Sequence, residues 1–463
     1  MNTRFCIRSI LLAASIATAP LGVVPLAGAA DLGSIYQQAL KNDPLIREAE
    51  ANRLAARESK PQALSTLLPQ LTGSVGYDDS DADGSSPFGP QGQPGVFERQ
   101  AQRNSWDVTL RQSVFRWQNW AALRRADAES AQAEADYHAA QQNLILRTSE
   151  AYFNVLAAQD TLEAAQAAHD AIERQLEQSE KRFEVGLIAV TDVQEAKAAF
   201  DSATASLIQA KRNLATAQEQ LRELTGNTFD ELSRPGADMP LAGPNPADAE
   251  EWVKLAMDQN ARLISSRLAA DITRHDISSE RGGHFPSIDL VASRSSLDTN
   301  SDLITNGTPS SDDSDSKDTT VSLQLTVPLY SGGATSSRVR QAQYRHQAAR
   351  ERLERTARET ERETRDAYLG VNSEVARVQS LRQAVESAKT ALQATEAGYE
   401  VGTRTSVDVL EARRRLFEAQ TNYARSRYDY LLNVLRLRLA AGTLDDQGIT
   451  DINALLIESV RVR

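Results

Sequence analysis

Two stretches of this chain carry an apolar residue at every seventh position over an unusual length. Residues 120–184 contain neither proline nor glycine, and 65 residues in one helix would extend about 100 Å. Two such series interleave there, four residues apart, which is the spacing of a coiled-coil seam. The first series is Leu144, Ala151, Ala158, Ala165 and Ile172, and the second is Val155, Leu162, His169, Leu176 and Phe183. A further series predicts a matching long helix later in the chain: Val371, Val378, Val385, Leu392 and Tyr399.

Four shorter segments alternate between apolar and polar residues. In one of them Val321, Leu323 and Leu325 alternate with serine, glutamine and threonine. Such alternation fits either a half-buried sheet or a strand that crosses a membrane with one face towards lipid. The expected strands cover about residues 68–77, 105–115, 286–296 and 319–330. The acidic segments between them, residues 78–103 and 298–317, predict long loops outside the cell.

The order of these elements occurs twice. Phe183-Glu184-Val185-Gly186 recurs 216 positions later as Tyr399-Glu400-Val401-Gly402. The repeat predicts two equivalent halves, each with a helical run, a strand pair, a long helix, a short break and a second helix. The halves are residues 31–226 and 249–442, with long helices at residues 116–184 and 334–398 and second helices at residues 191–226 and 405–442.

The helix lengths also add up. The helical run of residues 31–65 and the second helix of the same half, placed end to end, match one long helix. We therefore expect a tall bundle of continuous and stacked helices. The proline-rich connector, residues 227–248, and the segment 443–463 are expected as irregular stretches at mid-height.

The first 30 residues have the layout of a secretory signal peptide. Arg4 and Arg8 precede a short apolar run, and small residues follow near Ala29 and Ala30, where we predict cleavage. A membrane anchor is the less favoured interpretation, because the run is short and prolines interrupt it. The prediction is an exported protein.

Composition excludes several classes of protein. The net charge of −12 argues against a nucleic-acid binder. A mean hydropathy of −0.45 argues against a bundle of membrane-spanning helices. One cysteine and five scattered histidines predict no metal site, and no nucleophile–base arrangement or phosphate loop points to catalytic residues or a cofactor.

Four strands cannot close a barrel, and an open sheet edge in lipid would leave backbone groups without partners. If the strands cross a membrane, the chain must therefore form an oligomer. Two copies would supply eight strands, three copies twelve and four copies sixteen. The sequence arithmetic alone leaves these alternatives open.

Three runs carry a resemblance to a known family: RTSEAYFNVL at residues 147–156, RFEVGL at 182–187 and AGYEVGTRT at 397–405. With the duplication and the strand pairs in the same order, the mature chain resembles the TolC-type family of outer-membrane efflux and secretion channels. The resemblance implies a mainly α homotrimer whose twelve-stranded β-barrel lies in the outer-membrane lipid of a Gram-negative cell and continues as an α-helical barrel across the periplasm. It also implies two partners, a periplasmic adaptor (membrane fusion protein) and an inner-membrane transporter of the ABC, RND or MFS type. The function implied is the passive exit duct of a tripartite efflux pump or type I secretion system.

The resemblance also assigns a gate to the far ends of the long helices. In the family, a Tyr and an Arg of the second hairpin bond to an Asp of the neighbouring first hairpin and hold the tip shut. The matching residues here are Tyr399, Arg404 and Asp192. Ile188 is the repeat equivalent of Arg404, so the first hairpin lacks that cation. From the residues alone, a helix-capping box that begins at Thr191 is the favoured interpretation of Asp192, and the resemblance reverses that preference.

Two acids and two turns complete the expected site. Asp408 and Glu411 share a helix face, where the family places two rings of aspartate at the narrowest point of the pore. Solvated surface acids would give the same pattern, whereas six carboxylates in three copies would favour cations. The adaptor-docking surface would be the two tips, although their glycines are also explained by a tight turn. The docking residues are Val185, Gly186, Leu187, Val401, Gly402 and Thr403.

An alternative from another functional class is an exported coiled-coil structural or adhesion protein without channel activity. Long heptad series and a signal peptide fit that interpretation, but paired alternating strands do not. An enzyme is not expected.

Overall fold

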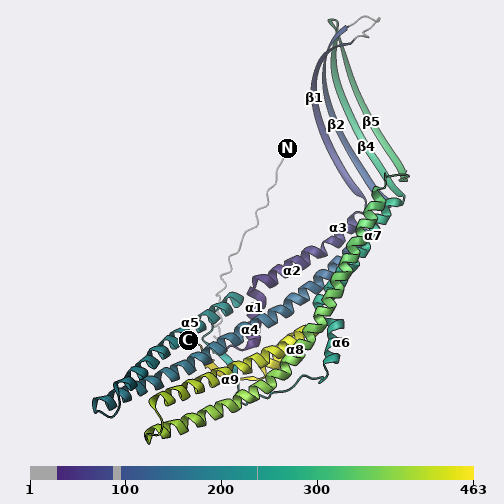
Figure 1. Ribbon diagram of the computed structural model, residues 1–463. Helices are drawn as coiled ribbons and strands as arrows, with labels where there is room; N and C mark the ends of the chain where they lie inside the picture. The colour runs from purple at the N-terminus through teal and green to yellow at the C-terminus, as the bar shows by residue number, and fades with distance from the viewer. Residues whose placement is uncertain (1–28, 87–94, 237, 463) are drawn as a thin grey trace, which may run out of the picture.

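The computed structural model describes residues 29–86, 95–236 and 238–462. Residues 1–28 of the predicted signal peptide lie outside the described residues. The molecule is elongated, with a curved sheet at one end and two helical hairpins at the other (Figure 1). Two long helices, α4 (Trp117–Glu184, 68 residues) and α8 (Ala334–Glu400, 67 residues), connect the ends.

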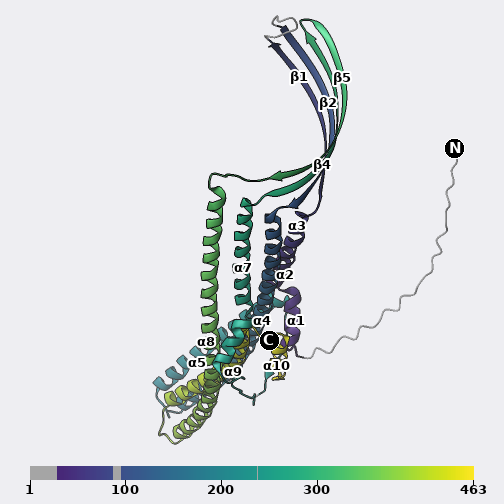
Figure 2. The ribbon, with the colours of Figure 1, turned by 90° about the vertical axis from the view of Figure 1, so that its right-hand side faces the viewer.

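The shaft below the sheet is a wall of helices that lie side by side (Figure 2). Near the sheet, α4 and α8 flank α7 (Ala261–Arg281), while α2 (Pro44–Arg57) and α3 (Ser59–Ser65) cover the other side of α4. Towards the tips, α4 pairs with α5 (Val190–Thr225) and α8 pairs with α9 (Ser406–Ala441).

The expected continuous helical run of residues 31–65 is wrong in detail. It is broken into α1 (Leu32–Asn42), α2 and α3. The break between α1 and α2 arises because Asp43 takes an extended conformation before Pro44 and caps α2 through Leu45. The second half breaks at Asn260 in the same way, between α6 (Ala249–Gln259) and α7.

These breaks are where the shorter helices meet end to end. The side chain of Asn42 donates to the carbonyl of Thr225 at the end of α5, over 2.6 Å. The side chain of Asn260 donates to the carbonyl of Ala440 at the end of α9, over 2.9 Å. Both amides bind C-terminal carbonyls that have no partner inside their own helix. Each joint therefore fixes one stacked pair.

The sheet has the order β1-β2-β4-β5 and is antiparallel throughout, with β1 at Gln70–Ser86, β2 at Gly95–Phe115, β4 at Ser287–Thr305 and β5 at Thr308–Thr326. The expected loops, residues 78–103 and 298–317, are wrong for most of their length. Pairing continues through them, as between Asp78 and Arg103 and between Asp298 and Asp315. Backbone ladders form where both faces are polar, so apolar alternation marked only part of each strand.

One face of the sheet is apolar near the helices and polar farther away. Leu71, Leu110, Ala292 and Val321 form a cross-strand row on it, whereas the row of Tyr77 continues as Asn104, Asp298 and Asp315. The opposite face carries polar rows, for example Thr72, Thr109, Ser293 and Thr320. Strands β1 and β5 each pair with one neighbour only.

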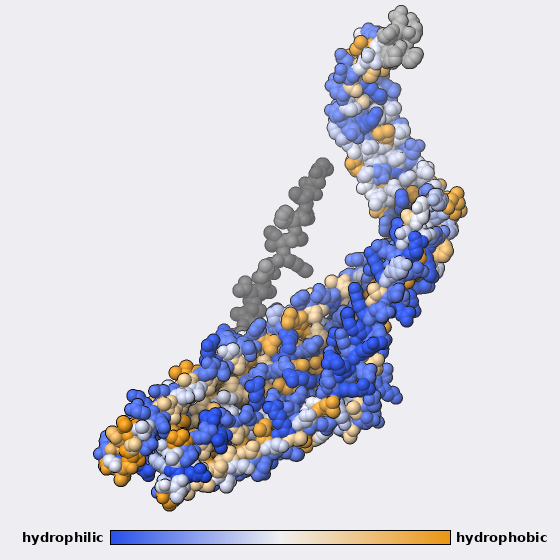
Figure 3. Space-filling view, viewed as in Figure 1, coloured by the Kyte–Doolittle hydropathy of each residue, from blue (hydrophilic) through white to orange (hydrophobic). Residues whose placement is uncertain are grey.

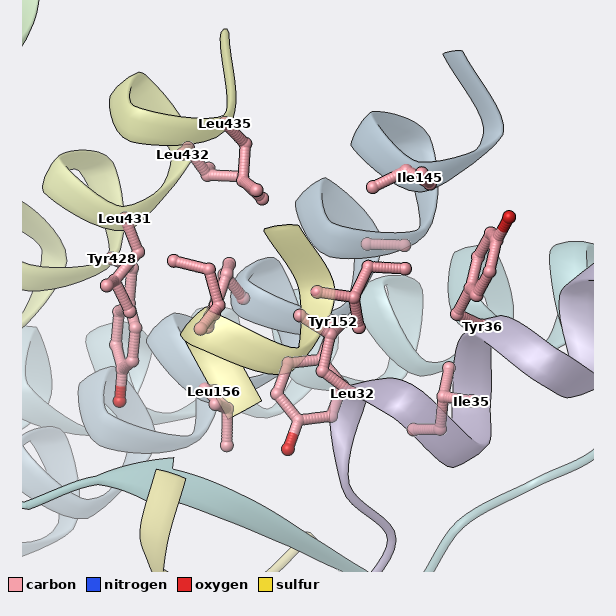
Figure 4. Packing of buried hydrophobic residues seen from close by; sticks show 14 of the residues in the cluster. Leu32, Ile35, Tyr36, Ile145, Tyr152, Leu156, Tyr428, Leu431, Leu432 and Leu435 are labelled. Carbon is pink, nitrogen blue, oxygen red and sulfur yellow. The ribbon is translucent and has the colours of Figure 1, made fainter. Parts of the chain in front are cut away.

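The mid-height segments are more regular than expected. Strand β3 (Glu231–Pro235) pairs with β6 (Leu456–Arg461), and α10 (Asp446–Asn453) precedes β6. The main hydrophobic core lies at the same height. There, Tyr152 and Leu156 of α4 pack with Tyr428 and Leu431 of α9 and with α1 (Figure 4). Full burial of such side chains stabilises the fold by about 1.5–3 kcal/mol each.

Candidate gate at the hairpin tips

Each hairpin ends in a turn that only glycine adopts easily. Gly186 has φ of 75° and Gly402 has φ of 78°, and a β carbon at either position would have open space around it. The amide of Leu187 donates to the carbonyl of Arg182, and the amide of Thr403 donates to that of Gly398. These are the repeat-equivalent bonds of a glycine-terminated helix end. The conformation, and not crowding, requires glycine here.

The tips present apolar side chains to solvent. Val185 is 70% exposed, Leu187 72% and Val401 75%. The space-filling view shows hydrophobic residues gathered at the end of the α4–α5 hairpin (Figure 3). Apolar side chains grouped at an exposed loop mark a surface that another molecule can cover.

The three predicted gate residues lie on separate turns around the tips. Asp192 is in the first turn of α5, which begins at Val190 after Ala189, so the capping box predicted from Thr191 does not form. Within the described residues, Asp192 and Arg404 make no ion pair with each other. The hydroxyl of Tyr399 is buried and has no hydrogen-bond partner there.

Tyr399 instead has an arginine above its ring. The guanidinium carbon of Arg182, in the last turn of α4, lies 4.9 Å from the ring centroid. Arg182 is not among the site residues predicted from the sequence. The contact joins two hairpins far apart in sequence, and no local pattern signals it.

Asp408 acts locally as a helix cap. Its carboxylate accepts hydrogen bonds from the amide of Thr405, over 2.9 Å, and from the Thr405 hydroxyl, over 3.0 Å. With the amide of Asp408 donating back to the Thr405 hydroxyl, these bonds form a capping box at the start of α9. The bonds from Thr405, with a smaller contribution from Arg404, hold the pKa of Asp408 below its usual value.

Glu411 is bound by two arginines of the next turn. Arg414 lies 2.7 Å and Arg415 3.1 Å from its carboxylate, and the hydrogen bond from Arg414 is the main cause of a lowered Glu411 pKa. Neither arginine is among the site residues predicted from the sequence, although positions three and four residues after Glu411 favour such ion pairs on a helix. Both acids are ionised at neutral pH, but Glu411 is locally neutralised.

A small cluster with metal-ligand atoms lies higher on α4. The ligand atoms of His169, Asp170 and Glu173 come within 4.8 Å of one another. The cluster contains one histidine and no cysteine, so histidine and cysteine spacing in the sequence does not indicate it. His169 contacts Asp170 at 3.4 Å and packs against Phe200, so ordinary helix-surface contacts account for it.

A family comparison decides the class of the protein. The sequence profile described as "Outer membrane efflux protein" matches residues 35–227 and 252–443, which are almost the two repeats. The chain is 38% identical to "Outer membrane protein TolC" of Vibrio cholerae over 92% of this chain and 94% of that protein. It is also 38% identical to "Outer membrane protein TolC" of Escherichia coli over 95% of this chain and 87% of that protein. The chain belongs to the outer membrane efflux protein family.

Solved structures share the fold. The CmeC outer membrane channel of Campylobacter jejuni aligns with a TM-score of 0.72 at 19% identity, over 92% of this chain and 90% of that one. VceC of Vibrio cholerae aligns with a TM-score of 0.70 at 20% identity, over 89% and 96%. From its family and its 38% identical relatives, the chain is an outer-membrane exit channel that extends into the periplasm. The alternative of a coiled-coil adhesion protein has no support among these relatives. Among the described residues, no helix is at once long and apolar enough to cross a membrane.

In this outer membrane efflux protein, several polar atoms are buried near the tips of the two hairpins. Four buried polar atoms there have no partner among the described residues: Gln175 Nε2, Ser179 Oγ, Tyr399 Oη and Ser406 Oγ. A groove of about 410 Å³ separates the hairpins just above, where alanines of α4 and α5 face Leu410 and Phe417 of α9. The apolar cluster at this level is small, with Leu162 and Phe417 packed against Ala165, Leu207 and Ala210.

Proposed function

We propose that three copies of this chain form one closed exit duct. The observation that carries the proposal is a four-stranded sheet with one apolar face and two open edges, β1 and β5. Pairing of β5 in one copy with β1 in the next would remove every edge and give twelve strands. Eight strands enclose only their own side chains, whereas a larger barrel leaves a water-filled lumen.

The two faces of the sheet support this orientation. Leu71, Val321 and Leu323 are each about two-thirds exposed in one copy and would face lipid. The polar rows of the opposite face would line the lumen. The helical wall would continue this lumen through the periplasm.

The lower end would be closed by the tips. Asp192, Tyr399 and Arg404 are our gate residues, and the absence of an Asp192–Arg404 ion pair inside one chain fits a bond between neighbouring copies. Asp408 and Glu411 would form the narrowest rings below the lumen. Of the two, Asp408 has no basic partner in an ion pair among the described residues and would contribute most of the negative potential.

The exposed tips Val185–Gly186–Leu187 and Val401–Gly402–Thr403 are proposed to receive the partner that opens the gate. A periplasmic adaptor joined to an inner-membrane transporter of the ABC, RND or MFS type would supply both contact and energy. "Alkaline protease secretion protein AprF" of Pseudomonas aeruginosa, 29% identical over 89% of this chain and 85% of that protein, supports a role in type I secretion as well as in efflux. The chain itself would catalyse no reaction.

Planar-bilayer recording of the purified protein beside Arg404→Ser tests the proposal. We expect small, cation-selective currents that increase in the variant, and trimers in native mass spectrometry. Arg358→Ser is the control, because Arg358 is paired with Glu354 on an exposed helix surface remote from the tips. Intact oligomers without current would contradict the duct. Currents that Arg404→Ser leaves unchanged would contradict the gate.

A further inference from the structure

The two hairpins carry their arginines on opposite sides of the turn. At the repeat offset of 216, Arg182 before the first turn corresponds to Gly398 before the second, while Ile188 after the first turn corresponds to Arg404 after the second. Each hairpin therefore has one arginine at a position where the other has none. The duplication has left two different contacts at equivalent places.

Arg182 contacts the second hairpin of its own chain. Its guanidinium lies over the ring of Tyr399 at 4.9 Å, which joins the last turn of α4 to the last turn of α8. Within the described chain, the Arg182 guanidinium takes part in no ion pair, and its contact is with the Tyr399 ring. A guanidinium at this distance from an aromatic face is attracted by the negative charge of the π-system.

The hydroxyl of Tyr399 contributes no bond to this contact. It is buried without a hydrogen-bond partner in the described part of the chain. Burial of a hydroxyl without a partner weakens the closed arrangement. Within one chain, the aromatic face is therefore what holds Tyr399 against the first hairpin.

We propose that Arg182 and the ring of Tyr399 form a latch that keeps the two hairpins of one protomer together and so helps to close the tip. This inference rests on the proposed function, since it adds a closing residue to that gate. It also gives Tyr399 a second role, because the ring holds Arg182 within one chain while the hydroxyl remains available for a bond to Asp192 of the neighbouring copy. A planar guanidinium suits this contact better than a lysine ammonium, which is attracted to the ring but cannot stack on it.

A latch made of one cation–π contact holds the two hairpins together only weakly. At a partly exposed site, loss of one cation–π contact changes an opening equilibrium by about two- to fivefold per protomer. An adaptor that contacts the adjacent Val185 and Leu187 could therefore displace Arg182 without breaking any large apolar interface.

The test compares substitutions that separate ring from hydroxyl. We expect Arg182→Gln and Tyr399→Leu to raise bilayer conductance, Arg182→Lys to raise it less than Arg182→Gln, and Tyr399→Phe, which keeps the ring, to raise it less than Tyr399→Leu. The double variant Arg182→Gln/Tyr399→Leu should open no further than Tyr399→Leu alone. Arg174→Gln is the matched control, an exposed arginine two turns higher on the same helix. Opening by Tyr399→Phe equal to that by Tyr399→Leu, or no opening by Arg182→Gln, would overturn the latch.

A second measurement needs no channel activity. Ser179 is fully buried near the tip, so a Ser179→Cys background reports separation of the hairpins through its rate of maleimide labelling in detergent. Labelling should quicken by about two- to fivefold with Arg182→Gln or Tyr399→Leu, and less with Tyr399→Phe, which keeps the ring. This pattern without any current would preserve the latch while contradicting the duct. Equal labelling in all variants would contradict the latch, whatever the currents are.

Discussion

Arg404 lies against Gly398 so closely that a β carbon on the glycine would come within 2.8 Å of the arginine Cγ. The amides of Thr403 and Arg404 both donate to the carbonyl of the same glycine, which folds the turn back onto the last turn of α8. Gly398 is helical and has no need of a positive φ. Its missing side chain is what positions Arg404.

We therefore predict that Gly398→Ala opens the tip. Alanine favours the helix by about 1 kcal/mol over glycine, yet its methyl group displaces Arg404 from the turn. Bilayer conductance should rise towards the level of Arg404→Ser. Gly370→Ala is the control, because a β carbon there would meet Asn433 at an ordinary 3.6 Å. If the two alanine variants conduct alike, the contact does not position Arg404.

Tyr428→Phe should weaken the mid-height junction. The Tyr428 hydroxyl donates to the buried carboxylate of Asp160 over 2.7 Å, and loss of this donor should cost about 1–3 kcal/mol. The midpoint temperature of heat dissociation should fall at pH 8. Tyr423→Phe is the control, since that hydroxyl makes no hydrogen bond within the described residues.

The cost of Tyr428→Phe should depend on pH. Burial raises the pKa of Asp160 despite its bonds to Tyr428 and Arg234. Below the unfolded pKa the carboxyl is protonated in both states and contributes nothing, whereas above the raised folded pKa its buried charge destabilises the fold. The difference between variant and parent should thus shrink as the pH falls from 8 to about 4. A pH-independent difference would mean that Asp160 is not the group affected.

Asp408→Asn should reduce cation selectivity more than Glu411→Gln does. Asparagine can still cap α9, but it removes a charge that no arginine of the described residues meets in an ion pair. Because Thr405 depresses the folded pKa of Asp408, this charge is present above that pKa and disappears only as the pH falls through it. In the parent channel, reversal potentials measured across a salt gradient should therefore still indicate cation selectivity below about pH 4. An equal loss in both variants would show that Arg414 and Arg415 do not screen Glu411.

The two faces of β5 predict opposite tolerance of charge. Leu323→Arg places a charge on the apolar face and should cost about 2–4 kcal/mol per copy, enough to lower the amount recovered from outer membranes. Ser322→Arg, one position away on the polar face, should insert normally and alter conductance instead. Fractionation and bilayer recording of the pair check this. Equal recovery of both variants would contradict the assignment of the faces.

Periodicity proved most informative where one face of an element is buried. The heptad series located α4 and α8, because a helix face in continuous contact must repeat. The alternation located only part of each strand, since Asp312 and its neighbours pair through backbone groups alone. The turn at Asn306-Gly307, where both residues have positive φ, was a readable hairpin signal that apolar patterning does not include.

The site was harder to predict than the fold. The resemblance selected Tyr399 and Arg404, but the partner of each depends on packing between hairpins. Arg182 contacts Tyr399, which is 217 positions later in the chain. Gly398 matters because it has no β carbon, which leaves the space that Arg404 occupies. Neither relationship leaves a local pattern in the sequence.

The concentration of the core at mid-height makes each long helix a lever. Val155 of α4 is fixed in that core, and Glu184 at the helix end lies 29 residues away, about 44 Å along the axis. Tilting this arm by about 5° would carry the tip roughly 4 Å sideways while the pivot hardly moves. A partner can therefore widen the exit of the duct by a displacement smaller than one side chain, and the membrane end need not take part.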